Sequence, residues 1–256
     1  MEKIQELLPH QKYAFCFVPI SPLRAASDDR SEIVSQVLFG EIVEIKSFGK
    51  PWIQIETLHD GYQGFADIKQ FIPLTEKEMR RWFDEHEIVQ GIFAELQTPW
   101  GNQWITSGAY ANAGRFSIGN LSFCLQEQSF GNRSITSISN EFLNTPYLWG
   151  GRSPFGIDCS GFTQLVFRQL EKNLPRDAYQ QAELGLDVAF DEKEVGDLAF
   201  FGKTKEKITH VGIVLENNQI IHASGRVRVD VFSENGIINS DNDELSHTYI
   251  SLRRLL

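Results

Sequence analysis

The sequence has few cysteines, fewer basic than acidic residues and no long apolar segment. Its three cysteines, Cys16, Cys124 and Cys159, are scattered and form no CxxC pair, so we expect neither a disulfide framework nor a structural zinc site. The formal net charge is −10 at pH 7, which argues against nucleic acid or an anionic membrane as a partner. No run of residues approaches the roughly 20 apolar positions of a membrane-spanning helix.

The first ten residues contain acidic side chains and no extended apolar core, so they differ from a secretory signal. Together with the few cysteines, this predicts a cytoplasmic protein, with removal of an upstream export signal as the alternative. The 256 residues suffice for one large domain or several small ones. A hydrophobic content of 41% and a charged content of 23% are ordinary for a globular protein.

Short strands separated by turns are predicted between Val18 and Leu74. The segments 41–45 and 52–56 mix polar and β-branched residues, and residues 49–51 separate them as a hairpin connection. About five or six short strands in this stretch predict a small β-barrel. We therefore assign residues 1–74 to an N-terminal arm and a first barrel.

A helix is predicted over residues 75–87, because Thr75 and Glu78 have the spacing of a capping box and apolar residues follow at helical spacing. This helix would link the first barrel to a second, less regular barrel over residues 88–130. Serine- and asparagine-rich residues 129–140 mark the next boundary, so residues 131–256 form a third domain. Helices followed by strands predict an α+β domain with an antiparallel sheet there.

The most informative stretch runs from Tyr147 to Phe162. Turn residues continue to Gly156, and Asp158 stands as a helix N-cap before apolar residues at helical spacing. Cys159 would then lie in the first turn of a helix, where the helix dipole lowers a thiol pKa and free N–H groups can hold an oxyanion. A buried, unreactive cysteine is the alternative for this position.

Two histidines on predicted strands could serve such a thiol. Alternate residues share a face along the segment 208–215, so His210 lies opposite the apolar positions. His222 would share the face of His210 if the loop at 216–218 has three residues. Cys159 would then attack as the nucleophile, His210 would act as base and later as acid, and His222 would orient the ring of His210.

Each histidine alone could instead be a packed structural side chain. A zinc site made of Cys159, His210 and His222 is the competing chemistry, but it lacks a fourth ligand at the usual spacing. We therefore expect no metal and no other cofactor.

Four short motifs occur in an order found in a known family. They are Asp-Cys-Ser-Gly-Phe at 158–162, Gly-Asp-Leu at 196–198, His-Val-Gly-Ile-Val at 210–214 and Ile-His-Ala-Ser-Gly at 221–225. On these motifs, the segment of about 130–256 resembles the NlpC/P60 family of papain-like cysteine peptidases. The resemblance implies a Cys–His–His triad of Cys159, His210 and His222. It also implies hydrolysis of the γ-D-glutamyl bond to an L-diamino acid in bacterial cell-wall (murein) peptides.

Pieces of the first barrel, at 22–25, 38–41 and 61–65, resemble a bacterial SH3-like domain. Two SH3-like domains before an NlpC/P60 domain resemble a branch of that family that trims wall peptides with a free N-terminal L-alanine. This resemblance implies that Glu32 and Tyr62 meet the substrate ammonium, which needs a carboxylate and hydrogen-bond acceptors once desolvated. A solvated strand charge and a barrel-edge aromatic are the alternatives.

Four further residues match substrate-contacting positions of such enzymes: Trp149, Asp158, Ser160 and Asp177. Trp149 could form an apolar wall, and Asp158 could serve both as helix cap and as partner of the substrate amine. The expected function is hydrolysis of L-Ala-γ-D-Glu-diamino acid peptides in murein recycling. An amidase or acyltransferase on a papain-like scaffold and a wall-peptide binding module are the alternatives. The preferred diamino acid and the oligomeric state stay open.

Overall fold

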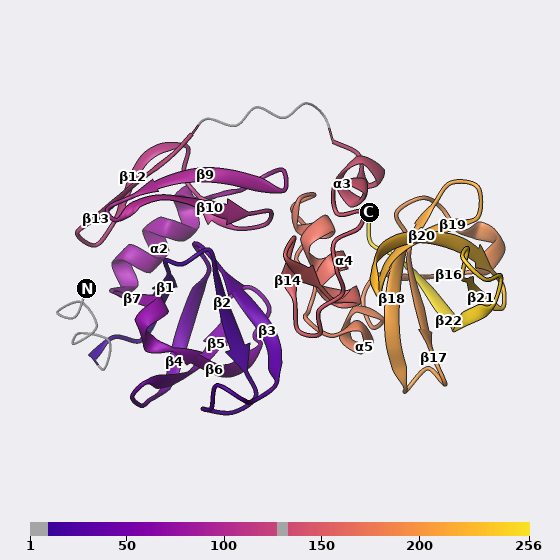
Figure 1. Cartoon of the computed structure of the whole chain (residues 1–256), viewed down its shortest axis with the longest axis horizontal. Coiled ribbons are helices and arrows are strands. Elements are labelled where there is room, and N and C mark those ends of the chain that lie inside the picture. Colours follow the sequence, from indigo (N-terminus) through magenta and orange to yellow (C-terminus); the bar gives the residue numbers. More distant parts are fainter. Residues whose placement is uncertain (1–9, 127–132) are drawn as a thin grey trace. The chain divides into compact units, whose positions relative to one another are not determined.

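The computed structural model describes residues 10–126 and 133–256. The chain divides into two compact units, Met1–Gly131 and Asn132–Leu256. Both units consist mainly of antiparallel strands (Figure 1). Within the described residues, no helix has the length and apolar character needed to cross a membrane.

Unit 1 begins with a seven-stranded antiparallel sheet in the order β3-β2-β6-β5-β4-β1-β7. Its strands are β1 (Tyr13–Cys16), β2 (Ile20–Arg24), β3 (Ile33–Leu38), β4 (Ile42–Phe48), β5 (Trp52–Thr57), β6 (Gln63–Asp67) and β7 (Phe71–Leu74). Side chains alternate along β5, where Ile53 and Ile55 are fully buried. They pack with Leu23, Val37 and Val43, so the period-two pattern of this strand forms one wall of an apolar core.

Helix α2 (Glu76–Glu85) follows β7 and has the predicted capping box. Thr75 Oγ1 accepts from the Glu78 N–H at 3.2 Å, and Glu78 Oε2 accepts from the Thr75 N–H at 2.9 Å. The buried Trp82 anchors the helix, because its Nε1–H donates to the Gly40 carbonyl at 2.8 Å. The helix is thereby fixed to the turn between β3 and β4.

The rest of unit 1 contains a four-stranded antiparallel sheet in the order β10-β9-β13-β12 and a separate β8–β11 pair. These strands are β8 (Glu87–Ile88), β9 (Phe93–Thr98), β10 (Gly101–Thr106), β11 (Tyr110–Ala111), β12 (Gly114–Ile118) and β13 (Leu121–Leu125). Phe116 and Phe123 pack edge-on against Phe39. The second SH3-like barrel expected over 88–130 stays a prediction, and residues 127–130 lie outside the described ranges.

Unit 2 has its helices before its main sheet, as the α+β interpretation predicts. The helices are α3 (Ile135–Glu141), α4 (Cys159–Arg168) and α5 (Ala178–Gln181), and the hairpin β14 (Arg152–Ser153) to β15 (Gly156–Ile157) precedes α4. Figure 1 shows these helices on one side of the strands. Helix α4 is buried along its whole length and packs against β18 and β19, so its first residue is held at a fixed place beside the sheet.

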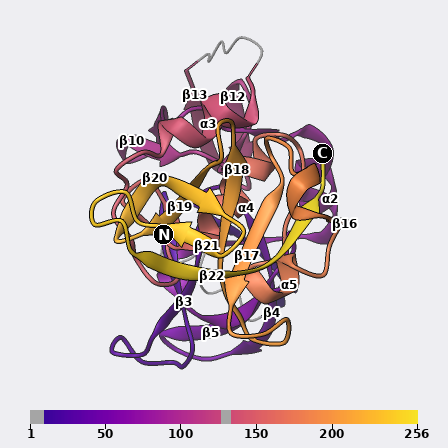
Figure 2. The same cartoon turned by 90° about the vertical axis from the view of Figure 1, so that its right-hand side faces the viewer.

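The main sheet of unit 2 closes on itself (Figure 2). Its order is β16-β22-β17-β18-β19-β20-β21, and β21 also pairs with β22. The strands are β16 (Leu186–Val188), β17 (Leu198–Gly202), β18 (Ile208–Leu215), β19 (Gln219–Ser224), β20 (Arg226–Ser233), β21 (Gly236–Ile238) and β22 (Leu245–Arg254). Strands β17 to β22 form a barrel-like ring around a core that includes Phe201, Val214 and Phe232.

Candidate active site

A buried carboxylate fixes the start of α4. Asp158 is the N-cap, and its Oδ1 accepts from the Gly161 N–H at 2.7 Å, as the sequence predicts. Position 161 requires glycine, because a Cβ there would lie 2.3 Å from the Gly151 carbonyl oxygen. Cys159 is therefore the first residue of the helix, and it is 6% exposed.

The Cys159 thiol lies against the strand that carries His210. The backbone N–H groups of Ser160 and Val211 hydrogen-bond to the sulfur. Burial nevertheless raises the pKa of Cys159 to about 12, and the negative charge of Asp158 adds to the rise. The expectation of a lowered thiol pKa is thus wrong for the resting protein, because removal of the sulfur from water outweighs the stabilisation by its N–H donors.

The two predicted histidines meet on one face of the sheet. His222 pairs with Gly212 across β18 and β19, and Leu215 pairs with Gln219, so the connecting loop has the three residues that the shared face requires. His210 Nε2 and His222 Nδ1 are 2.8 Å apart, and the ring planes are nearly perpendicular at 85°. Both side chains are buried. Burial lowers the pKa of His210 well below its usual value, and the charges of His222 and His247 lower it further, so His210 rests as a neutral base.

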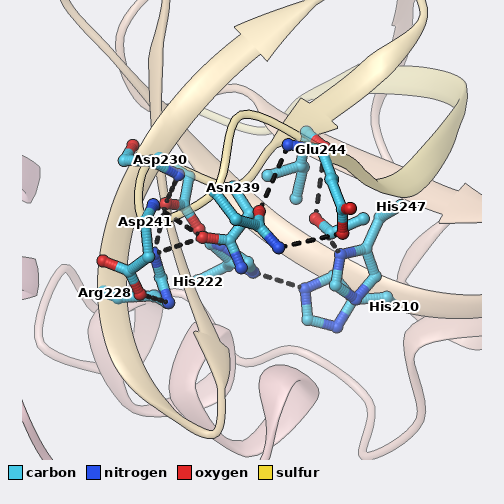
Figure 3. Close-up of polar contacts among 12 residues, drawn as sticks. His210, His222, Arg228, Asp230, Asn239, Asp241, Glu244 and His247 are labelled. Atoms are coloured by element: carbon cyan, nitrogen blue, oxygen red, sulfur yellow. Dashed lines mark hydrogen bonds and ion pairs between the residues drawn. The ribbon is translucent and has the colours of Figure 1, made fainter.

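An anchored carboxylate lies behind His222. Asp230 Oδ2 is 2.9 Å from His222 Nε2, and Asp230 Oδ1 accepts from Arg228 Nη2 at 2.8 Å and from the Ser240 N–H at 2.9 Å (Figure 3). Burial alone would raise the pKa of Asp230, but the hydrogen bonds from His222, the Ser240 N–H and Arg228 lower it overall. The sequence interpretation missed Asp230. A signal for it was available, because alternate residues of a strand share a face. Arg228 lies directly opposite His222, so Asp230, two residues further along β20, lies on the same face as both.

A third imidazole covers His210. The His247 ring on β22 stacks on the His210 ring with centroids 4.1 Å apart and planes 25° apart. Its Nδ1 is 2.9 Å from Ser246 Oγ. Burial lowers the pKa of His247 to about 4, with a smaller contribution from His222. No motif around His247 marks it in the sequence.

The nitrogen atoms of His210, His222 and His247 lie within 4.8 Å of one another, a separation that could suit a metal ion. Their lone pairs do not converge, however, because His210 and His222 are hydrogen-bonded to each other and His247 lies face to face with His210. In this arrangement a metal would have to displace the existing contacts, so the site suits proton transfer better than metal binding.

The site contains a second carboxylate, that of Asp158, and it is paired with Arg176. Arg176 Nη2 lies 2.5 Å from Asp158 Oδ2, and Nη1 donates to Asp158 Oδ1 at 3.0 Å and to Ser160 Oγ at 2.8 Å. Asp158 Oδ2 also accepts from the Gly150 N–H at 2.9 Å. These donors occupy the carboxylate, so the expected contact of Asp158 with a substrate amine would require displacement of Arg176 or a backbone donor. The same arginine engages the hydroxyl of Ser160.

Tyr147 is a further residue of the site to which the sequence interpretation gave no role. Burial raises its pKa to about 12, and the charges of Cys159 and Asp158 raise it in the same direction. The phenol therefore lies near the thiol and stays protonated at neutral pH, which makes it a hydrogen-bond donor. Its place at the start of the stretch 147–162 was the only sequence signal.

The remaining predicted substrate-binding residues are less tightly defined by the geometry. Trp149 is 62% exposed, as an apolar wall open to a ligand would be. Asp177 precedes α5, and its backbone N–H donates to Gln180 Oε1 at 3.1 Å. Glu32 immediately precedes β3, and Tyr62 immediately precedes β6 and packs on the first core of unit 1. Their contact with a substrate stays a prediction.

The geometry of unit 2, a thiol at a helix start beside paired histidines on a barrel-like sheet, defines a class of cysteine peptidase. Residues 144–243 match the NlpC/P60 family, and residues 23–71 match the bacterial dipeptidyl-peptidase Sh3 domain. Unit 2 therefore contains an NlpC/P60 domain, and a bacterial SH3 domain precedes it in the chain.

Two curated relatives illustrate the similarity. Gamma-D-glutamyl-L-lysine dipeptidyl-peptidase of Bacillus subtilis is 44% identical over 84 residues, which are 32% of this chain and 28% of that protein. The probable endopeptidase NlpC homolog of Haemophilus influenzae is 36% identical over 127 residues, which are 49% of this chain and 64% of that protein. The chain thus spans less than two thirds of the length of either relative.

Solved structures share the fold. The crystal structure of an NlpC/P60 family protein from Bacillus cereus superposes with a TM-score of 0.76 at 19% sequence identity, covering 94% of this chain and 99% of that one. An NlpC/P60 endopeptidase from Photobacterium damselae gives a TM-score of 0.67 at 15% identity, covering 98% of this chain and 75% of that one.

Proposed function

We propose that this protein is a cysteine endopeptidase that cuts the γ-D-glutamyl–L-diamino acid bond of murein peptides with a free N-terminal L-alanine, and that it acts in the cytoplasm in murein recycling. The observation that carries the proposal is the arrangement of a buried thiol, bonded by the Val211 N–H, beside the hydrogen-bonded pair His210–His222. Two relatives named gamma-D-glutamyl-L-lysine dipeptidyl-peptidase, from Bacillus subtilis and Bacillus cereus, support the bond specificity.

The proposed chemistry begins with the neutral thiol. His210 Nε2 is engaged by His222, so Nδ1 of His210 is the nitrogen that takes the proton from Cys159 as sulfur attacks the γ-carbonyl carbon. N–H groups at the start of α4 and the protonated Tyr147 hydroxyl are the candidate donors to the oxyanion. Collapse of the tetrahedral intermediate releases the diamino acid amine, which receives the proton from His210. Water, deprotonated by His210, then hydrolyses the thioester.

Substrate selection is proposed to depend on recognition of the N-terminal amine of the peptide and on an apolar wall. Glu32 and Tyr62 are the candidates for the ammonium of L-alanine, for the reason that a desolvated cation needs a carboxylate and acceptors. The exposed Trp149 is the candidate apolar wall. A free amine would thereby be required for cleavage.

The test is turnover of L-Ala-γ-D-Glu-meso-diaminopimelate and its L-lysine analogue, with products identified by mass spectrometry. We expect cleavage only after D-glutamate, and a loss of at least about a thousandfold in kcat for Cys159→Ala, since the nucleophile is removed. Cys124→Ala, a change of the same kind in unit 1, serves as the control and should retain wild-type activity.

Other products would redirect the assignment. Release of the alanine residue or transfer of the acyl group to an added amine would indicate the amidase or acyltransferase. Tight peptide binding without any product would indicate a binding module. Undiminished cleavage by Cys159→Ala would refute thiol catalysis altogether.

A further inference from the structure

The hydrogen-bonded series of the site continues past the histidine pair and ends at a buried carboxylate. Asp230 and His222 have side chains only 2% and 1% exposed. The oxygen of Asp230 that faces away from His222 receives two donors, Arg228 Nη2 and the Ser240 N–H. Figure 3 shows this series running from His210 through His222 to Asp230. The carboxylate is therefore held in position independently of the histidine.

A carboxylate in this place decides which ring nitrogens carry protons. An ionised carboxylate can only accept, so the Nε2 of His222 must be the donor to Asp230 Oδ2. In neutral His222 the Nδ1 then has the lone pair, and it accepts from the Nε2–H of His210. Neutral His210 is consequently left with its lone pair on Nδ1, the nitrogen that can take a proton from a thiol.

We propose that Asp230 is a positioning residue of the active site, which sets the tautomer of His222 and through it makes Nδ1 of His210 the basic nitrogen. This inference rests on the proposed cysteine peptidase activity for its kinetic consequence, but the tautomers themselves can be observed without any substrate. Asp230 is hydrogen-bonded to His222, Arg228 and the Ser240 N–H, so its effect on the thiol would be transmitted through His222.

The competing explanation is a purely structural role. Arg228 bridges three side chains, since it also donates from Nη1 to Asp241 Oδ2 at 2.7 Å and from Nη2 to Asn239 Oδ1 at 3.0 Å. Asp230 could thus merely fasten β20 to the segment 239–241. Asp241 supplies the matched control, because it pairs with the same arginine but has a side chain that is 63% exposed, whereas His222 pairs with Asp230.

The substitution Asp230→Asn tests the proposal with little change in shape. Arg228 and the Ser240 N–H both require an acceptor at the Oδ1 position, so the amide oxygen is expected there and the NH2 group toward His222. His222 Nε2 would then have to accept, its Nδ1 would carry the proton, and His210 Nε2 would have to accept in turn. The remaining proton of His210 would be on Nδ1, where it blocks the base.

We expect kcat of Asp230→Asn to fall by about a hundredfold or more with KM changed less than about threefold, which is the scale of general-base catalysis. Asp241→Asn should keep kcat within about threefold. Nitrogen-15 NMR of histidine-labelled protein should show His222 protonated at Nε2 and His210 at Nε2 in the wild type, with both protons moved to Nδ1 in Asp230→Asn. A structural role would lower thermal stability without exchanging the tautomers.

Three results would overturn the proposal: reversed tautomers in the wild type, near wild-type kcat in Asp230→Asn, or an equal loss in Asp241→Asn. The wild-type spectrum tests the proposed tautomers of His210 and His222 even if Asp230→Asn does not fold. If the wild type cleaves no murein peptide, the proposed function fails, and the tautomers of the wild type and the variant still decide the role of Asp230.

Discussion

Cys159 combines a helix N-terminus, which favours a thiolate, with burial, which disfavours one. Burial dominates, since the pKa of the thiol rises to about 12. The resting site is therefore a neutral thiol beside a neutral imidazole, and the proton has to move during attack. This differs from a preformed thiolate–imidazolium pair, and the difference can be measured.

We expect alkylation of Cys159 by iodoacetamide to be slow at pH 7 and to accelerate by about tenfold per pH unit between pH 8 and 10, because a rising pH deprotonates a thiol whose pKa lies far above this range. The reaction is quenched at a series of times, the protein is digested, and mass spectrometry measures the alkylated fraction of the peptide that contains Cys159. Cys124→Ala removes the half-buried cysteine of unit 1 as a competing site. A rate that is already maximal at pH 6 would contradict a protonated resting thiol.

Individual residues show how far sequence reasoning reaches. His210 and His222 could be placed on one face because strand alternation and a three-residue loop are local properties. Asp230 was missed although β19 and β20 form a hairpin as local as that of β18 and β19. His247 could not be paired with the two histidines, since its approach depends on β22 pairing with the distant strand β17. The thiol pKa was mispredicted for the same reason: the helix terminus is visible in the sequence, whereas the burial of the sulfur is a property of the folded domain.

At the scale of elements, the start of α4 is held by a buried ion pair. Asp158 and Arg176 have side chains 8% and 2% exposed, and Arg176 comes from the segment before α5. The pair therefore joins the cap of one helix to the approach of the next. Loss of one partner leaves the other charge buried and unpaired, which costs far more than loss of a surface pair.

Arg176→Met should lower the free energy of unfolding by about 3–5 kcal/mol, because the buried carboxyl group of Asp158 would lose the guanidinium that pairs with it. Urea denaturation followed by circular dichroism measures the change. Arg30→Met is the matched control, since Arg30 pairs with Asp28 on the surface with a side chain 91% exposed, and it should change stability by less than about 1 kcal/mol. Equal losses of stability in the two variants would show that burial does not make the Asp158–Arg176 pair more important than a surface pair.

The elements themselves divide into those that local signals predict and those that they do not. The capping box at Thr75 and the N-cap at Asp158 are both confirmed, because their partners lie within one helical turn. The strand bounds of β18 and β19 follow from apolar alternation and the turn residues between them. The β17–β22 pairing has no such signal, because it joins residues 198–201 to residues 249–253, which lie far apart in the sequence.

At the scale of the whole molecule, the chain combines an NlpC/P60 domain with a unit that contains a bacterial SH3 domain. The thiol and histidines all belong to unit 2, whereas Glu32 and Tyr62 belong to unit 1. Under the proposed function, the two units have separable tasks: unit 2 breaks the bond, and unit 1 recognises the free amine.

Glu32→Gln should therefore raise KM for the free-amine peptide by about tenfold or more while leaving kcat within about twofold, since a charge-assisted contact with the ammonium is lost and the chemical groups are untouched. Steady-state kinetics with free and N-acetylated peptides provide the measurement. Glu76→Gln makes the same change on the surface of α2, where the side chain is 63% exposed, and should alter neither constant. An unchanged KM in Glu32→Gln would remove Glu32 from the recognition of the amine.

Strand β22 has a consequence for the order in which activity is acquired during synthesis. It is translated after every other strand of the barrel, yet it pairs with both β17 and β21 and carries the imidazole that stacks on His210. A nascent chain that ends before residue 245 has two open sheet edges and an uncovered base. Residues 245–254 must therefore leave the ribosome before the barrel can close and before His247 can cover His210.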